Sequence, residues 1–277
     1  MKKLTILLVM SLITIMTNGC SKEAYAHFVL VKGGTFKNIK SNYYNSTQQI
    51  KDFYMGAYEV TQKEWQEVMG NNPSQFVGDD LPVETVSWYD CIEYCNKRSM
   101  KEGLTPYYNI EKNIIDPHNI CTYDAQKWTV SINQDADGYR LPTEIEWEYA
   151  ASGGQKSKDT LYSGSDKVDD VAWYWRNAGD EYLKGQWDWI SIENNHNITQ
   201  KLGQKNANEL GIYDMSGNVR EWCWDWYQDE VFESGFYRVW RGGGLIGDGS
   251  CCQITYRGKF EPNGIGYDQG FRICRNA

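Results

Sequence analysis

The helix start that decides the fold lies in residues 139–154, YRLPTEIEWEYAASGG. Thr143 is followed three positions later by Glu146, a pairing in which each side chain accepts a hydrogen bond from the other residue's backbone N–H. Gly153 and Gly154 follow the apolar residues, and glycine readily adopts the left-handed backbone that closes a helix. The stretch therefore predicts one short helix that begins after Thr143 and ends before Gly153.

Two similar helix starts lie upstream. Residues 61–64, TQKE, predict a helix that ends at Gly70, and residues 87–90, SWYD, predict a helix that reaches about Met100. Beyond Ser152 the chain shows no strongly periodic helix, but short aromatic segments, many glycines, and turns rich in Asn and Asp. No internal repeat or proline-rich linker divides it. We expect one α+β domain with few helices, short strands and much irregular loop structure.

The first twenty residues are typical of an export signal. Two lysines precede an apolar run from Leu4 to Met16, which is too short to span a bilayer. The pair Gly19-Cys20 follows, and a small residue before a cysteine at this place resembles a bacterial lipobox. We expect residues 1–19 to be a lipoprotein signal peptide and Cys20 to carry lipid. The alternative is ordinary signal cleavage beside an incidental cysteine.

Residues 20–26 are then a short lipid-anchored tether, and residues 27–277 are the folded domain. The expected location is the cell envelope, at the surface of the outer membrane, with lipid as the only contact to the membrane. The net charge of −9 argues against nucleic acid as a partner, because phosphates require a basic face. Only three histidines are present, which argues against a multi-histidine metal centre. We expect a monomer.

Several ordered stretches resemble the formylglycine-generating enzyme family, also called the sulfatase-modifying factor domain, which has a C-type lectin fold. The resemblance covers roughly residues 27 to 275 and implies that fold for this chain. The stretches are YEVTQKEW (58–65), PVETVSWYDCIEYCN (82–96), residues 139–154, NELGIYDMSGNVREW (208–222), RVWRGGG (238–244) and GFR (270–272).

The resemblance also permits a test for the family's oxidase activity. The enzymes oxidise a sulfatase cysteine to formylglycine, and they use two cysteines that hold copper. Counting from Gly242-Gly243, these positions fall on Gly247 and Cys252. Copper(I) needs soft thiolate ligands, which glycine cannot supply. Cys251 is expected to project to another side of an extended backbone. We therefore predict that the chain is not an enzyme.

A calcium ion is a second implication of the resemblance. The matching positions are Asp214, Gly217, Val219 and Glu221, which offer the hard oxygen ligands that calcium prefers. The alternative is a polar turn capped by Asp214, with Glu221 paired to an arginine. Both interpretations stay open at this point, and no other cofactor is expected.

The last part of the chain, from Gly242 to Arg272, combines a family framework with ill-assorted residues. The latter are largely those that an asparagine codon yields when its two adenines are replaced. Adenine-directed replacement of this kind is a property of diversity-generating retroelements, and the chain resembles their variable proteins, those of the Treponema type above all. The expected ligand-binding positions, within segment 245–268, are Leu245, Ile246, Gly247, Asp248, Ser250, Cys251, Thr255, Tyr256, Gly258, Phe260, Asn263, Ile265, Tyr267 and Asp268.

These observations predict a surface lipoprotein that binds a macromolecule without catalysis. A rigid scaffold would hold a loop surface whose side chains can change without loss of the fold. The expected partner is a protein or glycan on a host or bacterial surface. The alternatives are a formylglycine-generating oxidase acting on a protein cysteine, and a structural component of the envelope.

Overall fold

Each of the three predicted helices begins at its predicted capping residue. In the computed structural model, which describes residues 28–36, 41 and 47–277, the side chains of Thr61, Ser87 and Thr143 accept a hydrogen bond from the backbone three residues later. The acidic side chain at that place in turn accepts a hydrogen bond from the backbone N–H of the capping residue. The two bonds satisfy backbone groups that a helix start otherwise leaves unpaired. The helices are α1 (Gln62–Met69), α2 (Trp88–Lys101), α3 (Glu144–Ala151), α4 (Val168–Val171) and α5 (Trp189–Asn194), with 3-10 turns η1 (Gly154–Lys156) and η2 (Gly249–Cys252).

The strands are short and form several small sheets, so the α+β class with few helices is confirmed. The central sheet has the order β11-β10-β9-β12, in which β12 runs parallel to β9 and the other pairs are antiparallel. The strands are β1 (Phe28–Val31), β2 (Gly34–Phe36), β3 (Gln48–Ile50), β4 (Phe53–Gly56), β5 (Tyr108–Ile115), β6 (Trp128–Ile132), β7 (Ala172–Trp173), β8 (Ser216–Gly217), β9 (Arg220–Trp226), β10 (Arg238–Arg241), β11 (Gly258–Phe260), β12 (Gln269–Gly270) and β13 (Cys274–Asn276).

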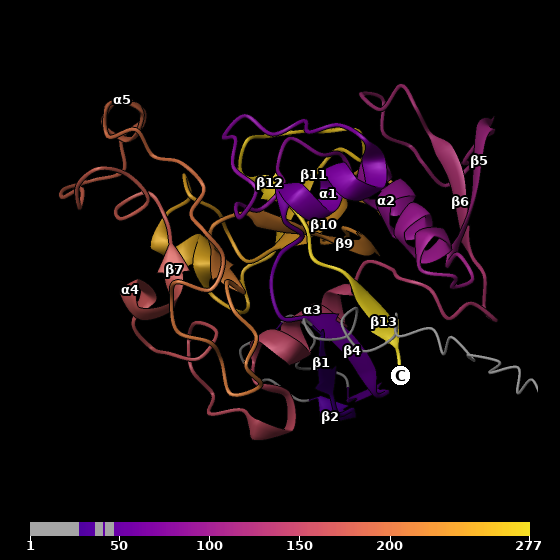
Figure 1. Ribbon diagram of the computed structural model, residues 1–277, viewed down its shortest axis with the longest axis horizontal. Helices are drawn as coiled ribbons and strands as arrows, with labels where there is room; N and C mark the ends of the chain where they lie inside the picture. Colours follow the sequence, from indigo (N-terminus) through magenta and orange to yellow (C-terminus); the bar gives the residue numbers. More distant parts are fainter. Residues whose placement is uncertain (1–27, 37–40, 42–46) are drawn as a thin grey trace, which may run out of the picture.

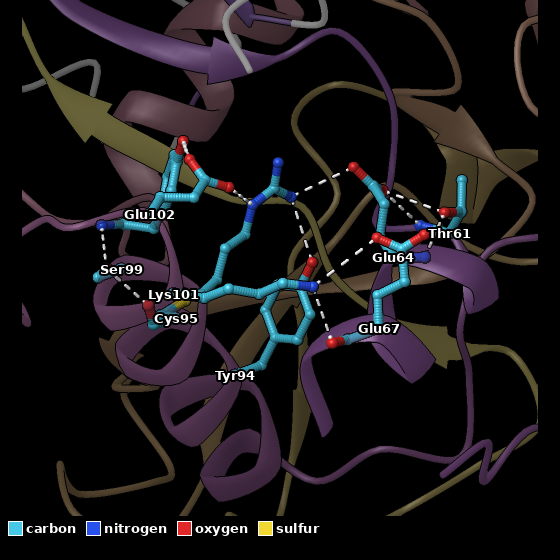
Figure 2. Close-up of polar contacts among 10 residues, drawn as sticks. Thr61, Glu64, Glu67, Tyr94, Cys95, Ser99, Lys101 and Glu102 are labelled. Atoms are coloured by element: carbon cyan, nitrogen blue, oxygen red, sulfur yellow. Dashed lines mark hydrogen bonds and ion pairs between the residues drawn. The ribbon is translucent and has the colours of Figure 1, made fainter. Parts of the chain in front are cut away.

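Ion pairs fasten α1 to α2 (Figure 2). The Arg98 guanidinium donates to Glu64 at 3.2 Å and to Glu102 at 2.9 Å, so one side chain joins both helices. Lys101 donates to the backbone carbonyl of Glu67 at 2.9 Å. Because Glu64 also belongs to the capping box of α1, the start of that helix is held by the neighbouring helix as well as by its own residues.

A second sheet has the order β1-β4-β13, so the first described strand and the C-terminal strand lie on either side of β4. Figure 1 shows β1 and β13 in the lower half of the molecule, while α5, β11 and β12 lie in the upper half. The start of the described chain therefore lies on a different side of the domain from β11 and β12. Within the described residues, no helix has the length and apolar character needed to cross a membrane.

Candidate ligand-binding surface

Segment 245–268 begins where β10 leaves the central sheet. Gly242 and Gly243 have φ angles of 89° and 72°, a left-handed backbone that favours glycine. A Cβ atom at Gly243 would lie 2.8 Å from the carbonyl oxygen of Cys251. The two glycines therefore let the chain turn sharply and return close to η2.

Two arginines fix the backbone of the segment to α3. Arg241 is fully buried and donates to Glu144 at 2.7 Å, to Glu148 at 2.8 Å and to the carbonyl of Ile254. Arg257 donates to the Glu144 carboxylate at 2.8 Å through Nη2. Planar guanidinium groups match carboxylates in two-point contacts, and the two cations balance the two buried carboxylates. These contacts hold the backbone of the segment at Ile254 and Arg257.

Three of the predicted binding positions are buried, which corrects the sequence-based set. Leu245 has no exposed surface, and a Cβ atom at Gly258 would lie 1.9 Å from the ring of Trp240. Asp268 is 2% exposed and forms an ion pair with Arg220. Burial raises the pKa of the Asp268 carboxyl, and the Arg220 guanidinium opposes this shift. The three residues hold the segment in place and cannot contact a ligand.

The other predicted positions lie at the surface, wholly or in part. Ile265 is 54% exposed and Tyr256 is 37% exposed, whereas Phe260 stacks on the buried Trp222 and shows only part of its ring. Buried residues that hold the backbone and exposed side chains thus alternate along this one segment. The exposed and half-buried members are Ile246, Gly247, Asp248, Ser250, Cys251, Thr255, Tyr256, Phe260, Asn263, Ile265 and Tyr267.

The two adjacent cysteines have different surroundings. Cys252 is fully buried in a cluster with Tyr174, and burial raises the pKa of its thiol, so this thiol is poorly reactive. Cys251 is half-buried beside Tyr256, and burial of the phenol together with the Cys251 thiol raises the pKa of Tyr256 to about 12. A Cβ atom at Gly247 would lie 3.5 Å from the Cβ of Cys251. The expectation of an extended backbone at Cys251 is wrong, because residues 249–252 form a 3-10 turn.

This placement predicts that Gly247→Cys forms a disulfide with Cys251. Disulfides join Cβ atoms that are about 3.5–4.5 Å apart, and Gly247 does not have the left-handed backbone that would oppose a side chain. The measurement is intact mass under oxidising conditions, followed by peptide mapping. We expect loss of two hydrogens in Gly247→Cys and none in Gly247→Cys/Cys251→Ser. A bridge to Cys252 in the first variant would contradict the placement.

The two carboxylates among the four residues expected at a calcium ion have different surroundings. The Glu221 carboxylate is fully buried and accepts hydrogen bonds from Arg272 at 2.6 and 2.7 Å and from the Trp147 indole at 2.7 Å. Asp214 accepts a hydrogen bond from the backbone of Gly203 at 2.7 Å. Glu221 is therefore committed to an arginine, as the alternative interpretation predicted. Among the described residues, no group of three His, Cys, Asp or Glu side chains could hold a metal.

Aromatic residues far away in the sequence extend the surface of the segment. The Trp187 indole donates to the carbonyl of Ile246 at 2.7 Å. The rings of Trp189 and Phe76 lie 6.1 and 5.9 Å from the ring of Tyr267. Sequence reasoning missed these residues. The available signal was the tryptophan pair in QWDW (186–189), which stands in a polar loop where no core is expected.

A separate cavity of about 520 Å³ lies beside α1. Its lining includes Tyr58, Glu64, Arg98 and Ile273, and no residue of segment 245–268 contributes to it. Of the residues labelled in Figure 2, Thr61, Glu64 and Glu67 line this cavity. The cavity is therefore distinct from the candidate binding surface.

Comparison with known proteins confirms the family. The sulfatase-modifying factor enzyme 1-like domain matches residues 16–277. The chain belongs to this family. Within it, the chain is similar to the protein named chaperone protein LppX from Paenibacillus barcinonensis, with 57% identity over 248 residues that cover 90% of this chain and 89% of LppX.

The chain is also similar to a solved structure and to a named enzyme. Treponema denticola variable protein 1 has a similar structure, with a TM-score of 0.71 and 30% identity, covering 90% of this chain and 95% of that one. The formylglycine-generating enzyme of Streptomyces coelicolor is 30% identical over 155 residues, which are 50% of this chain and 48% of the enzyme. The family resemblance and the fold are thus confirmed, while similarity to this enzyme spans only half of the chain.

Proposed function

We propose that this protein is a non-catalytic binding protein of the cell envelope, which holds a macromolecular ligand on the exposed side chains of segment 245–268. The observation that carries the proposal is that anchoring residues and exposed residues alternate along this segment. Arg241, Arg257 and Asp268 hold the backbone from inside, while side chains such as Ile246, Tyr256 and Ile265 lie wholly or partly exposed between them. A rigid scaffold with replaceable surface side chains is the arrangement that binding loops use.

The ligand is proposed to be a protein rather than a glycan. Tyr256 offers a flat ring with a polar end, which suits either ligand. Ile246 and Ile265 are aliphatic and contribute to the same surface, and Ile265 is 54% exposed. Aliphatic side chains gain free energy by contact with other apolar groups, which a protein presents more readily than a glycan.

The oxidase alternative is disfavoured by chemistry. Gly247 supplies no thiol, and Cys252 is a fully buried thiol with a raised pKa. A reactive cysteine needs an accessible thiolate, and a copper(I) site needs soft sulfur ligands. We accordingly propose that the family fold serves here as a scaffold for binding.

The proposal can be tested by photo-crosslinking on intact cells. A benzophenone amino acid would replace Ile265 in one variant, Tyr256 in a second and Met100 in a third; Met100 is an exposed apolar residue on α2. We expect one discrete protein adduct from positions 265 and 256, and none from position 100. Equal crosslinking at position 100, or adducts with glycan only, would contradict the proposal.

Attachment to the membrane through Cys20 is part of the same proposal, although Cys20 lies outside the described residues. β1 lies in the lower half of the molecule, whereas β11 and β12 lie in the upper half (Figure 1), and an anchor before β1 is therefore proposed to leave the exposed residues near β11 and β12 accessible. We expect Cys20→Ala to move the protein from the membrane fraction to the soluble fraction. An unchanged partition between the two fractions would remove the anchor from the proposal.

A further inference from the structure

An exposed apolar surface continues beyond segment 245–268. It consists of Phe76, Val77, Trp187, Trp189, Ile190 and Tyr267, here called the aromatic face. Val77 is 80% exposed, Ile190 65%, Trp187 48% and Trp189 39%. Contiguous apolar side chains at this level of exposure are typical of interaction sites, and tryptophan and tyrosine are the usual energetic centres of such sites.

The loop that carries the two tryptophans is held from inside the domain. Asn197 is buried and donates to the backbone carbonyl of Trp175 at 2.8 Å, and Asn195 donates to the carbonyl of Glu181 at 2.9 Å. Asp188 accepts the backbone N–H of Ser191 at 2.9 Å and so caps α5. The tryptophans are therefore presented in a fixed geometry, which reduces the entropy lost on binding.

The charge around the aromatic face is negative. The stretch from Arg176 to Asn195 contains Asp180, Glu181, Asp188 and Glu193 against only Arg176 and Lys184. Arg176 is engaged by the carbonyls of residues 183 and 185. Burial raises the pKa of Tyr267, and the nearby Asp268 and Glu193 carboxylates add to this shift. A partner that binds here gains from positive charge.

We propose that the aromatic face binds unfolded polypeptide segments that combine lysine or arginine with apolar side chains. The inference rests on the proposed function and names the class of its ligand. A cationic side chain can lie over a tryptophan ring while a carboxylate stands nearby, and each such contact contributes about 0.5–2 kcal/mol.

An unfolded segment fits this face better than a folded protein does. Folding buries most large apolar side chains, so a native surface offers few of them together. An extended chain displays apolar and cationic side chains a few residues apart, which suits exposed tryptophans in a stretch of net negative charge. A folded protein that offers only positive charge is expected to bind weakly, and salt should release it.

The experiment uses two unfolded proteins of opposite charge as probes. Reduced and carboxamidomethylated lysozyme is unfolded and cationic, and α-lactalbumin treated in the same way is unfolded and acidic. Binding of each fluorescently labelled probe is followed by anisotropy, with native lysozyme as the folded control. We expect unfolded lysozyme to bind at least about ten-fold more tightly than either of the other two, a difference that a few hot-spot contacts can supply.

The face itself is tested with Trp187→Ala/Trp189→Ala. Both side chains are exposed, so the variant should keep the melting temperature of the native protein while its affinity for unfolded lysozyme falls about ten-fold or more. The matched control is Tyr123→Ala, which removes an aromatic ring that is 70% exposed outside the face. Its affinity should be unchanged.

The outcomes separate this inference from the proposed function. Equal affinity for native and unfolded lysozyme, equal affinity for the two unfolded probes, or unchanged binding by the double variant would each overturn the inference. Crosslinking at positions 256 and 265 would then still support a ligand on segment 245–268. If that crosslinking is absent but unfolded lysozyme still binds through Trp187 and Trp189, the inference about the aromatic face stands and the proposed function of segment 245–268 is wrong.

Discussion

Arg241→Met is expected to lower the free energy of unfolding by about 3–5 kcal/mol, the cost typical of removing one member of a buried ion pair. Arg241 has no exposed surface and neutralises Glu144 and Glu148, which are each 1% exposed. Methionine fills much of the volume but leaves the Glu148 carboxylate buried without its cation. Because domains are stable by only about 5–15 kcal/mol, the variant should lose a large share of its free energy of unfolding.

Urea denaturation followed by tryptophan fluorescence measures this loss. Arg241→Met/Glu148→Gln should regain part of it, because the second change removes the uncompensated charge. Lys63→Met removes an exposed cation from α1 and should alter stability by only about half a kcal/mol. A loss below about 1 kcal/mol in Arg241→Met would show that the ion pairs with α3 do not hold segment 245–268 in place.

Gly258→Ala is expected to be the second most disruptive change, at about 2–3 kcal/mol or more. The added Cβ atom would lie 1.9 Å from the Trp240 ring. Gly258 on β11 and Trp240 on β10 are paired across two hydrogen-bonded strands, so neither residue can easily move away. The strand pair must open for the methyl group to fit. Thermal melting measures the effect.

Gly247→Ala is the matched control within the same segment. Its Cβ atom would meet nothing closer than 3.4 Å, so its melting temperature should stay near that of the native protein. The pair of variants therefore distinguishes framework glycine from surface glycine. If Gly258→Ala melts like Gly247→Ala, position 258 belongs to the replaceable surface, and its assignment to the framework is wrong.

Local and family-level features of the fold were predictable because their causes lie within a few neighbouring residues. The capping boxes at Thr61, Ser87 and Thr143 each involve residues three positions apart, so the helix starts follow from short-range hydrogen bonds. The spacing of the RVWRGGG and GFR stretches likewise preserves a family framework, and the buried Arg241 and Arg272 confirm its structural role.

The membership of the binding surface was predictable only in part. Most of the positions expected in segment 245–268 are wholly or partly exposed, but a replacement pattern does not reveal the direction of each side chain. Leu245, Gly258 and Asp268 stand among exposed residues in the sequence, yet each is buried by a partner from another element, as Asp268 is by Arg220. Trp187 joins the surface through a hydrogen bond to Ile246, fifty-nine residues away.

The sequence by itself determined the family, the three main helix starts and the lack of a complete thiol pair at positions 247 and 252. Only the tertiary structure decided that Cys251 faces position 247, that Glu221 is committed to Arg272, and that Trp187 extends the binding surface. The physical reason is distance along the chain. Capping depends on adjacent residues, whereas burial and ion pairing depend on which remote element packs against a side chain.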